Sequence, residues 1–303
     1  MGDVVFGPIT SRRFGQSLGI DLSPDTKQCN FDCIYCELKK AKPVDIIKNP
    51  PSVKEVVESV KKALLKHKRI DVITLTANGE PTLYPHMKEL IKELHLIKES
   101  SKLLILSNGA TTVSDATREI LKELDIVKLS LDCVSEHCFK KIDRPLKGLL
   151  VEDIIDGIKK FRKLYNKELV LEVLVVEGIN DKVSEFEALR EVLNGIRPDR
   201  VDISTIDRPP AYSVKGVSVE RLKELSCILS SFPISIAYKR DYSEEKRDFT
   251  KDEILNMIDK RPQSFEDVQI SFSKQSIKLL NRLVGDGFLC TKDVAGVNFY
   301  KLS

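Results

Sequence analysis

The sequence lacks the long apolar runs of a membrane protein. No stretch of about 18 apolar residues occurs in the 303 residues, so we expect no transmembrane helix. The first residues, Met1 to Pro8, have neither the basic start nor the apolar core of a secretory signal. The Met-Gly opening also lacks Ser or Thr at position six, so a lipidation motif is incomplete. We therefore expect a cytoplasmic protein with no membrane partner.

A strong net charge is also absent. The formal net charge is only +3, which gives no global argument for nucleic-acid binding, although a local basic patch is not excluded. Hydrophobic residues make up 42% of the chain and charged residues 31%, as in globular proteins with a large core. The length predicts about two domains.

The cysteines do not follow the paired pattern of a disulfide framework. They number seven, which favours a reducing compartment. Four are scattered: Cys133, Cys138, Cys227 and Cys290. The other three, Cys29, Cys33 and Cys36, lie within eight residues, with no fourth cysteine near and no histidine before His67. Zinc sites and complete iron–sulfur sites usually need four protein ligands, so three thiolates suit a [4Fe–4S] cluster with one open iron. A partial zinc site and a chance cluster of thiols are the alternatives.

Short apolar strands alternate with helical patterns along most of the chain. We expect residues 1–16 to be irregular, residues 39–51 to be a connector, strands over 17–22, 71–76, 103–106, 126–131, 169–176, 200–204 and 234–237, and helices over 53–67, 86–99, 114–124, 151–164, 183–194 and 219–231. This alternation predicts a parallel sheet of βαβ units. Six units are too few for a closed eight-stranded barrel and indicate a partial (β/α)6 TIM-like barrel. Its chemistry would lie at the carboxyl ends of the strands.

Polar residues follow several of these strands at that end. They form the segments 77–82, 107–109, 132–133 and 205–210, where each alone would be ordinary turn chemistry. Alternation also places Lys128 and Asp132 on one face, and Glu172 interrupts an apolar strand. A charge inside a buried strand is costly unless it is paired. We interpret these residues as facing a polar lumen; a purely structural Lys128–Glu172 ion pair is the alternative.

The Cys-x3-Cys-x2-Cys spacing, with Tyr35 before the last cysteine, resembles the signature of the radical SAM superfamily over about residues 10–240. The resemblance implies a [4Fe–4S] cluster held by Cys29, Cys33 and Cys36. It also implies that S-adenosylmethionine binds the open iron and is cleaved to a 5′-deoxyadenosyl radical. Such an enzyme needs an external reductant of the flavodoxin or ferredoxin type.

The same resemblance suggests residues that bind S-adenosylmethionine. The run Asn78-Gly79-Glu80 resembles the family's Gly-Gly-Glu motif for the methionyl amino group, with Asn in place of the first Gly. The positions that bind the ribose and the carboxylate in relatives are occupied by Ser107, Asn108, Ser130 and Asp132. Tyr35 is placed like the residue that contacts the adenine.

Four further segments resemble the Fe–S oxidoreductases grouped with the wyosine tRNA-base synthases. These are residues 11–20, 143–145, 177–181 and 208–210. The resemblance makes tRNA a candidate substrate, with Arg12, Arg13 and Arg208 as candidate contacts. The archaeal tRNA enzymes hold a second cluster through upstream cysteines, whereas no cysteine precedes Cys29, which argues against pyruvate-dependent chemistry. The candidates for catalysis are Lys128, Cys133 as a hydrogen donor, and Glu172.

The tail has a different pattern, which predicts two domains, 1–245 and 246–303. We expect helices over 250–260, 264–269 and 273–285 and a hairpin formed by 288–291 and 298–301, a winged-helix-like α+β arrangement. Lys274, Lys278 and Arg282 would share one face of the third helix. Such a face would bind tRNA or other nucleic acid, or else contact a protein or present a substrate.

A rival hypothesis is a non-catalytic regulator. In that case the cysteines would sense redox state through an Fe–S or zinc site, and the tail would bind DNA. This hypothesis explains the tail but leaves the polar strand ends without a role.

Overall fold

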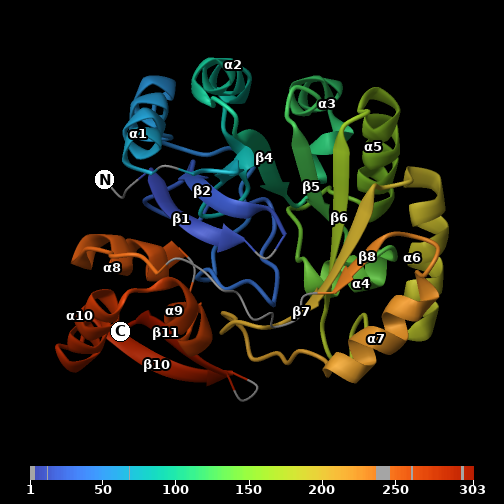
Figure 1. Cartoon of the computed structure of the whole chain (residues 1–303). Helices are drawn as coiled ribbons and strands as arrows, with labels where there is room; N and C mark the ends of the chain where they lie inside the picture. The colour runs from blue at the N-terminus through green and yellow to red at the C-terminus, as the bar shows by residue number, and fades with distance from the viewer. Residues whose placement is uncertain (1–3, 12, 68, 237–245, 261, 295–296) are drawn as a thin grey trace.

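The computed structural model describes residues 4–11, 13–67, 69–236, 246–260, 262–294 and 297–303. Its main feature is a curved eight-stranded sheet in the order β1 to β8 (Figure 1). The strands are β1 (Val5–Ser11), β2 (Gly15–Asp21), β3 (Val72–Thr76), β4 (Lys102–Ser107), β5 (Ile126–Ser130), β6 (Glu168–Val175), β7 (Arg200–Thr205) and β8 (Ile234–Ile236). Strands β2 to β8 pair in parallel, as the alternation predicted.

Helices cover the outer face of this sheet (Figure 1). They are α1 (Val53–Lys66), α2 (Met87–Ile97), α3 (Asp115–Leu121), α5 (Val151–Leu164), α6 (Val183–Ile196) and α7 (Val219–Ile228). A further helix, α4 (Glu136–Ile142), contacts the loop after β2, where the Ile142 carbonyl accepts from the Ile34 N–H at 2.9 Å. Serine side chains cap the amino ends of α1, α3 and α4, namely Ser52, Ser114 and Ser135. Of these helices, α4 was not predicted, because its two turns are too short for a clear periodicity. Within the described ranges, no helix is both long and apolar enough to cross a membrane.

The expectation that residues 1–16 are irregular is wrong. β1 pairs antiparallel with β2, and its register shifts between Phe6 and Ile9. Gly7 and Pro8 lie inside that shift and interrupt the alternation that would have revealed a strand. The Phe6 ring lies over Gly19, where a Cβ would come within 2.2 Å of the ring, so a side chain at position 19 would displace this ring.

The tail forms a second, smaller α+β unit, as predicted. It contains α8 (Lys251–Lys260), β9 (Gln263–Ser264), α9 (Phe265–Ser271), α10 (Lys274–Gly285), β10 (Leu289–Val294) and β11 (Val297–Leu302). The three strands pair as a separate antiparallel sheet in the order β10-β11-β9. Its apolar side chains form their own cluster, centred on Met257, Phe272 and Leu280. A capping box is present at α8, where Thr250 and Glu253 exchange hydrogen bonds.

A buried ion pair joins this unit to the barrel. The Lys260 ammonium pairs with Asp21 at the end of β2, and the two side chains are only 6% and 1% exposed. Lys260 also donates to the Pro24 carbonyl at 3.0 Å. The other carboxylate oxygen of Asp21 accepts from the backbone N–H groups of Ser23 at 3.0 Å and Asn78 at 2.7 Å. The tail therefore contacts the residue that positions the Asn78-Gly79-Glu80 segment.

Candidate metal centre

The three clustered cysteines lie in the long loop after β2, at the carboxyl end of the parallel strands. Cys29, Cys33 and Cys36 are free thiols and are partly buried. The Cys29 carbonyl accepts from the Val44 N–H at 2.8 Å, within the same loop. The Cys36 carbonyl accepts from the Ala211 N–H at 2.8 Å, in the loop after β7. The backbone on both sides of the cysteines is thus fixed by the fold.

Burial keeps these thiols protonated when nothing is bound. Burial raises the pKa of Cys29 to about 12, and it also raises the pKa of Cys33, to which Asp143 adds a further negative charge. Burial likewise raises the pKa of Cys36, although the Lys27 ammonium opposes this. A metal that binds here must therefore displace three protons, as thiolate-ligating metals do.

The spacing of the clustered cysteines suits a group larger than a single ion. Tetrahedral zinc with bonds of about 2.3 Å places its sulfur ligands about 3.8 Å apart. Among the described residues, Cys133, Cys138 and Glu185 have ligand atoms that all lie within 4.8 Å of one another, and the clustered cysteines do not meet this limit. The other free cysteines, Cys227 and Cys290, are exposed on α7 and β10. At least one pair of these three sulfur atoms is therefore more than 4.8 Å apart, which is farther than a single tetrahedral zinc ion would hold them.

A buried cation lies beside these thiols. The Lys27 side chain is only 5% exposed, and its Nζ has no hydrogen-bond partner among the residues that the structure describes. The closest carboxylate oxygen is Oδ1 of Asp32, at 3.7 Å. No sequence pattern identifies this residue, because a single lysine before the first cysteine matches no motif.

The loop after β7 forms hydrogen bonds that hold the cysteine loop in place. Arg208, a predicted substrate contact, donates instead to Glu37 at 3.2 Å. Four residues later, the Tyr212 hydroxyl donates to Asp32. Together with the Ala211 hydrogen bond, these contacts explain part of the role of the Arg-Pro-Pro segment.

Two exposed cations flank the Tyr212 ring. The Lys40 ammonium lies 4.0 Å and the Arg144 guanidinium 4.3 Å from the ring centroid. Arg144 has a positive φ of 46°, a conformation that is uncommon for a residue with a side chain. The rim of the cysteine loop is therefore cationic.

The Glu80 carboxylate joins the ends of β3 and β4. It accepts from the Thr82 hydroxyl at 2.6 Å and N–H at 3.0 Å, from the Ser107 hydroxyl at 2.8 Å and from the Asn108 N–H at 2.8 Å. Burial raises the pKa of Glu80, and these four hydrogen bonds favour the charged form and oppose that rise. Three predicted cofactor-binding residues, Glu80, Ser107 and Asn108, are thus brought together at one edge of the sheet.

Glycine is required at position 79. Gly79 has φ +139°, and a Cβ there would lie 1.8 Å from the Gln28 carbonyl oxygen. The backbone of Gln28 donates to the Asn78 carbonyl at 2.8 Å and accepts from the Glu80 N–H at 3.0 Å. This close approach fixes the Asn78-Gly79-Glu80 segment directly against the residue that precedes Cys29.

On the opposite side of the site, Tyr35 and Asp132 contact each other. The Tyr35 hydroxyl donates to one Asp132 oxygen at 2.5 Å, and the Leu174 N–H donates to the other at 2.7 Å. Burial raises the pKa of Asp132 to about 7, against these hydrogen bonds. The buried Asn180 side chain donates to the Asp132 carbonyl at 2.8 Å, which assigns a structural role to the 177–181 segment. Ser130 is the last residue of β5, two residues before Asp132, and it is half-buried.

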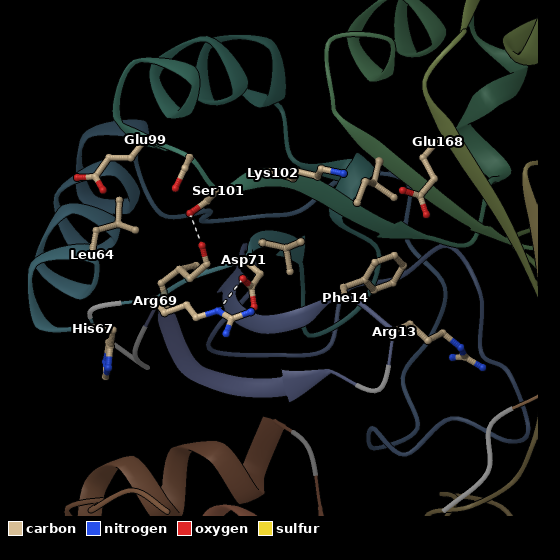
Figure 2. Close-up of a pocket in the computed structure, with 14 residues that line it drawn as sticks. Arg13, Phe14, Leu64, His67, Arg69, Asp71, Glu99, Ser101, Lys102 and Glu168 are labelled. Carbon is tan, nitrogen blue, oxygen red and sulfur yellow. Dashed lines mark hydrogen bonds and ion pairs between the residues drawn. The ribbon is translucent and has the colours of Figure 1, made fainter. Parts of the chain in front are cut away.

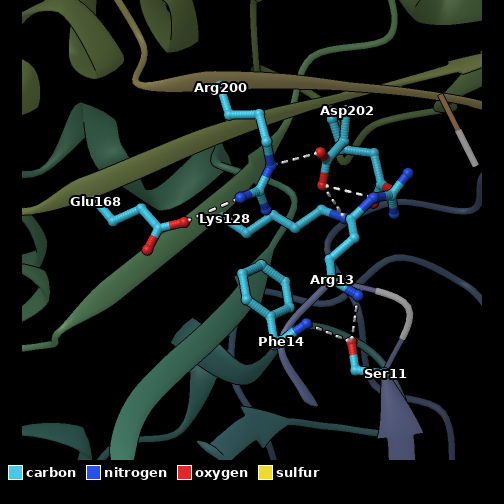
Figure 3. A network of polar contacts seen from close by, with 8 residues as sticks. Ser11, Arg13, Phe14, Lys128, Glu168, Arg200 and Asp202 are labelled. Carbon is cyan, nitrogen blue, oxygen red and sulfur yellow. Dashed lines mark hydrogen bonds and ion pairs between the residues drawn. The ribbon is translucent and has the colours of Figure 1, made fainter. Parts of the chain in front are cut away.

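An ion network fills the lumen below this level (Figure 3). Lys128 pairs with Glu172 at 2.7 Å and with Asp202 at 3.1 Å. Arg13, from the β1–β2 turn, pairs with the same two carboxylates at 3.4 Å and 3.1 Å. The Lys128–Glu172 ion pair that the alternative expectation described is present, as part of a larger network of charges. The guanidinium of Arg13 is engaged within the chain, and Arg12 lies outside the described residues.

The lumen is closed below the network by Phe14. Its ring packs on an apolar layer of inward-facing strand residues, namely Val72, Leu104, Ile126 and Val170. Beyond Phe14 lies a pocket of about 460 Å³ lined by residues that include Arg69, Asp71 and Lys102 (Figure 2). It opens at the amino ends of the strands, so Phe14 and the ion network separate it from the cysteines.

Cys133 is not a free thiol in this structure. It forms a disulfide with Cys138, which links the end of β5 to α4. The sequence pattern did not predict this bond, and Cys133 in this state cannot donate a hydrogen atom. A separation of five residues gave no indication of the bond, which depends on how α4 folds back on β5.

Comparisons with known proteins agree with this geometry. Residues 23–193 match the family model of the radical SAM superfamily. The chain is 39% identical over 300 residues to a UPF0026 protein of Helicobacter pylori (strain ATCC 700392 / 26695), covering 98% of this chain and 97% of that protein.

Two solved structures have a similar fold. A radical SAM methyltransferase from Sphaerobacter thermophilus has a TM-score of 0.57 at 16% identity, over 74% of this chain and 67% of that one. TYW1 with a bound lysine–pyruvate adduct has a TM-score of 0.53 at 18% identity, over 72% of this chain and 74% of that one. The family match and the cysteine loop at the carboxyl ends of the strands lead to one conclusion: this chain belongs to the radical SAM superfamily.

Proposed function

We propose that Cys29, Cys33 and Cys36 hold the [4Fe–4S] cluster that the superfamily uses, and that S-adenosylmethionine binds beside it. The observation that carries this proposal is the donor set: three partly buried free thiols in one loop whose sulfur atoms do not all lie within 4.8 Å of one another, while the other free thiols among the described residues are exposed elsewhere. Three thiolates leave one iron free for a small molecule. When bound, the two cofactors supply an electron and a 5′-deoxyadenosyl radical that abstracts hydrogen from a substrate.

The chain would orient S-adenosylmethionine from two sides of the cysteine loop. On one side, Glu80 and Asn108 offer carboxylate and amide groups beside Cys29, because the Asn108 side chain reaches the Cys29 sulfur at 3.7 Å. A carboxylate suits an ammonium, and an amide suits ribose hydroxyls. On the other side, Tyr35 and Asp132 present a further carboxylate and an aromatic ring. The closed base of the lumen would exclude water from the reacting atoms.

The test is S-adenosylmethionine cleavage by the reconstituted protein. After anaerobic loading with iron and sulfide, we expect 5′-deoxyadenosine to form when dithionite and S-adenosylmethionine are added, and not when dithionite is left out. A protein that carries the cluster yet never cleaves S-adenosylmethionine would overturn the proposal and favour the redox-sensing regulator.

We propose a flavodoxin- or ferredoxin-type protein as the natural electron donor. The exposed cations at the rim of the cysteine loop, Lys39, Lys40 and Arg144, support this proposal. A cationic rim favours association with a negatively charged partner and speeds the encounter.

We further propose that residues 246–303 are a separate domain that binds a nucleic-acid substrate, with tRNA as the first candidate. Its own apolar cluster and the three exposed cations of α10, Lys274, Lys278 and Arg282, support this proposal. Replacing all three cations with glutamine should weaken tRNA binding in an electrophoretic shift assay. It should also reduce the slope of the logarithm of the binding constant against the logarithm of the salt concentration, by the equivalent of about three phosphate contacts.

A matched variant separates this effect from the loss of charge alone. Lys54, Lys61 and Lys62 are equally exposed, but on α1 of the barrel. Replacing these three with glutamine should leave tRNA binding nearly unchanged. Equal weakening in both triple variants would mean that α10 is not the binding face.

A further inference from the structure

Among the residues that the structure describes, no carboxylate forms a close ion pair with the buried ammonium of Lys27. Lysine is seldom buried to this degree unless it is paired, because an isolated buried charge is costly. Its one carboxylate neighbour, Asp32, is 3.7 Å away, beyond hydrogen-bond distance. The other oxygen of that carboxylate accepts from the Tyr212 hydroxyl. Asp32 alone therefore does not account for the burial of Lys27.

The clustered cysteines are close to Lys27, which precedes Cys29 by two residues in the chain. Burial lowers the pKa of Lys27, and negative charge on Cys36, Cys29 or Cys33 raises it. Neutral thiols cannot compensate an ammonium, whereas three thiolates around an iron–sulfur cluster carry a net negative charge. That negative charge increases by one electron on reduction, and net charge near a cluster is one of the factors that set its reduction potential.

We infer that Lys27 offsets the negative charge of the bound cluster and thereby raises its reduction potential. Lys27 stabilises the reduced cluster more than the oxidised one, because the reduced form is the more negative. The external donor supplies the electron, and the ammonium transfers no proton. Asp32 has the opposite effect, since its carboxylate opposes the arrival of an electron. This inference rests on the proposed cluster.

The test is a potentiometric titration of the reconstituted full chain, followed by the electron paramagnetic resonance signal of the reduced cluster. Replacing Lys27 with methionine (Lys27→Met) should make the midpoint potential more negative by about 59 mV for one electron. This corresponds to about a tenfold change in the equilibrium constant of reduction. Lys27→Arg keeps the charge and should remain close to the wild type. Asp32→Asn should shift the midpoint in the positive direction.

The control is Lys42→Met, which removes an exposed lysine from the same loop. It should leave the midpoint unchanged, because solvent screens an exposed charge. Equal midpoints for Lys27→Met, Lys42→Met and the wild type would overturn the inference. If the Lys27→Met protein does not hold a cluster, the midpoint potential of the Asp32→Asn protein is the test. An absent or negative shift in that variant would overturn the inference. A wild-type chain that loads no cluster would instead contradict the proposed function.

Discussion

Replacing any one of Cys29, Cys33 and Cys36 with serine should abolish S-adenosylmethionine cleavage. Three thiols are the only cluster ligands that the described residues offer at this site, so the loss of one leaves two. Even the loss of groups that merely support a metal ligand costs about 10–100-fold in metal affinity or activity. We therefore expect at least about a 100-fold fall in 5′-deoxyadenosine formed, together with a loss of bound iron measured by a colorimetric assay.

The control for this experiment is Cys227→Ser. Cys227 is an exposed free thiol on α7 and should contribute nothing to the site. Its iron content and cleavage rate should match those of the wild type. Full cleavage by a Cys33→Ser protein, or a loss in the Cys227→Ser protein, would show that the cluster has been placed wrongly.

Replacing Asp202 with asparagine should destabilise the barrel by about 3–5 kcal/mol, because it leaves buried cations uncompensated. The Asp202 side chain is fully buried and pairs with Arg13, Lys128 and Arg200 at 3.1, 3.1 and 2.8 Å. The change leaves these three cations with two carboxylates, Glu172 and Glu168. Thermal unfolding followed by circular dichroism should show a lower midpoint, and urea titration should give the free energy.

Two further variants make the assignment specific. Lys128→Met combined with Asp202→Asn restores charge balance and should recover part of the lost stability. Asp156→Asn breaks an exposed ion pair with Lys160 and should cost no more than about 1 kcal/mol. An Asp202→Asn protein as stable as the Asp156→Asn protein would mean that the lumen charges are effectively solvated.

The sequence alone predicted the parts of the site that depend on local spacing and on strand polarity. The cysteine spacing is local, so it could be read directly. Glu80, Asn108 and Asp132 could be placed at one edge because parallel strands bring their carboxyl ends together. The structure confirms that these residues follow β3, β4 and β5.

Other features depended on contacts between distant segments and were missed. Arg13 seemed available for a substrate because nothing local shows that the β1–β2 turn inserts it beside Asp202. The Cys133–Cys138 disulfide depends on the fold of α4, which is itself too short to predict. Lys27 is buried beside Asp32, which accepts a hydrogen bond from Tyr212, 180 positions along the chain, and no local pattern predicts this contact.

The most direct test of the central claim is Mössbauer spectroscopy of protein reconstituted anaerobically with ⁵⁷Fe, recorded with and without S-adenosylmethionine. If three cysteines leave one coordination position vacant, the addition of S-adenosylmethionine should change the spectrum of one iron in four and leave the others as they were. A spectrum that S-adenosylmethionine does not alter, or a native protein that contains zinc in place of iron, would contradict the account.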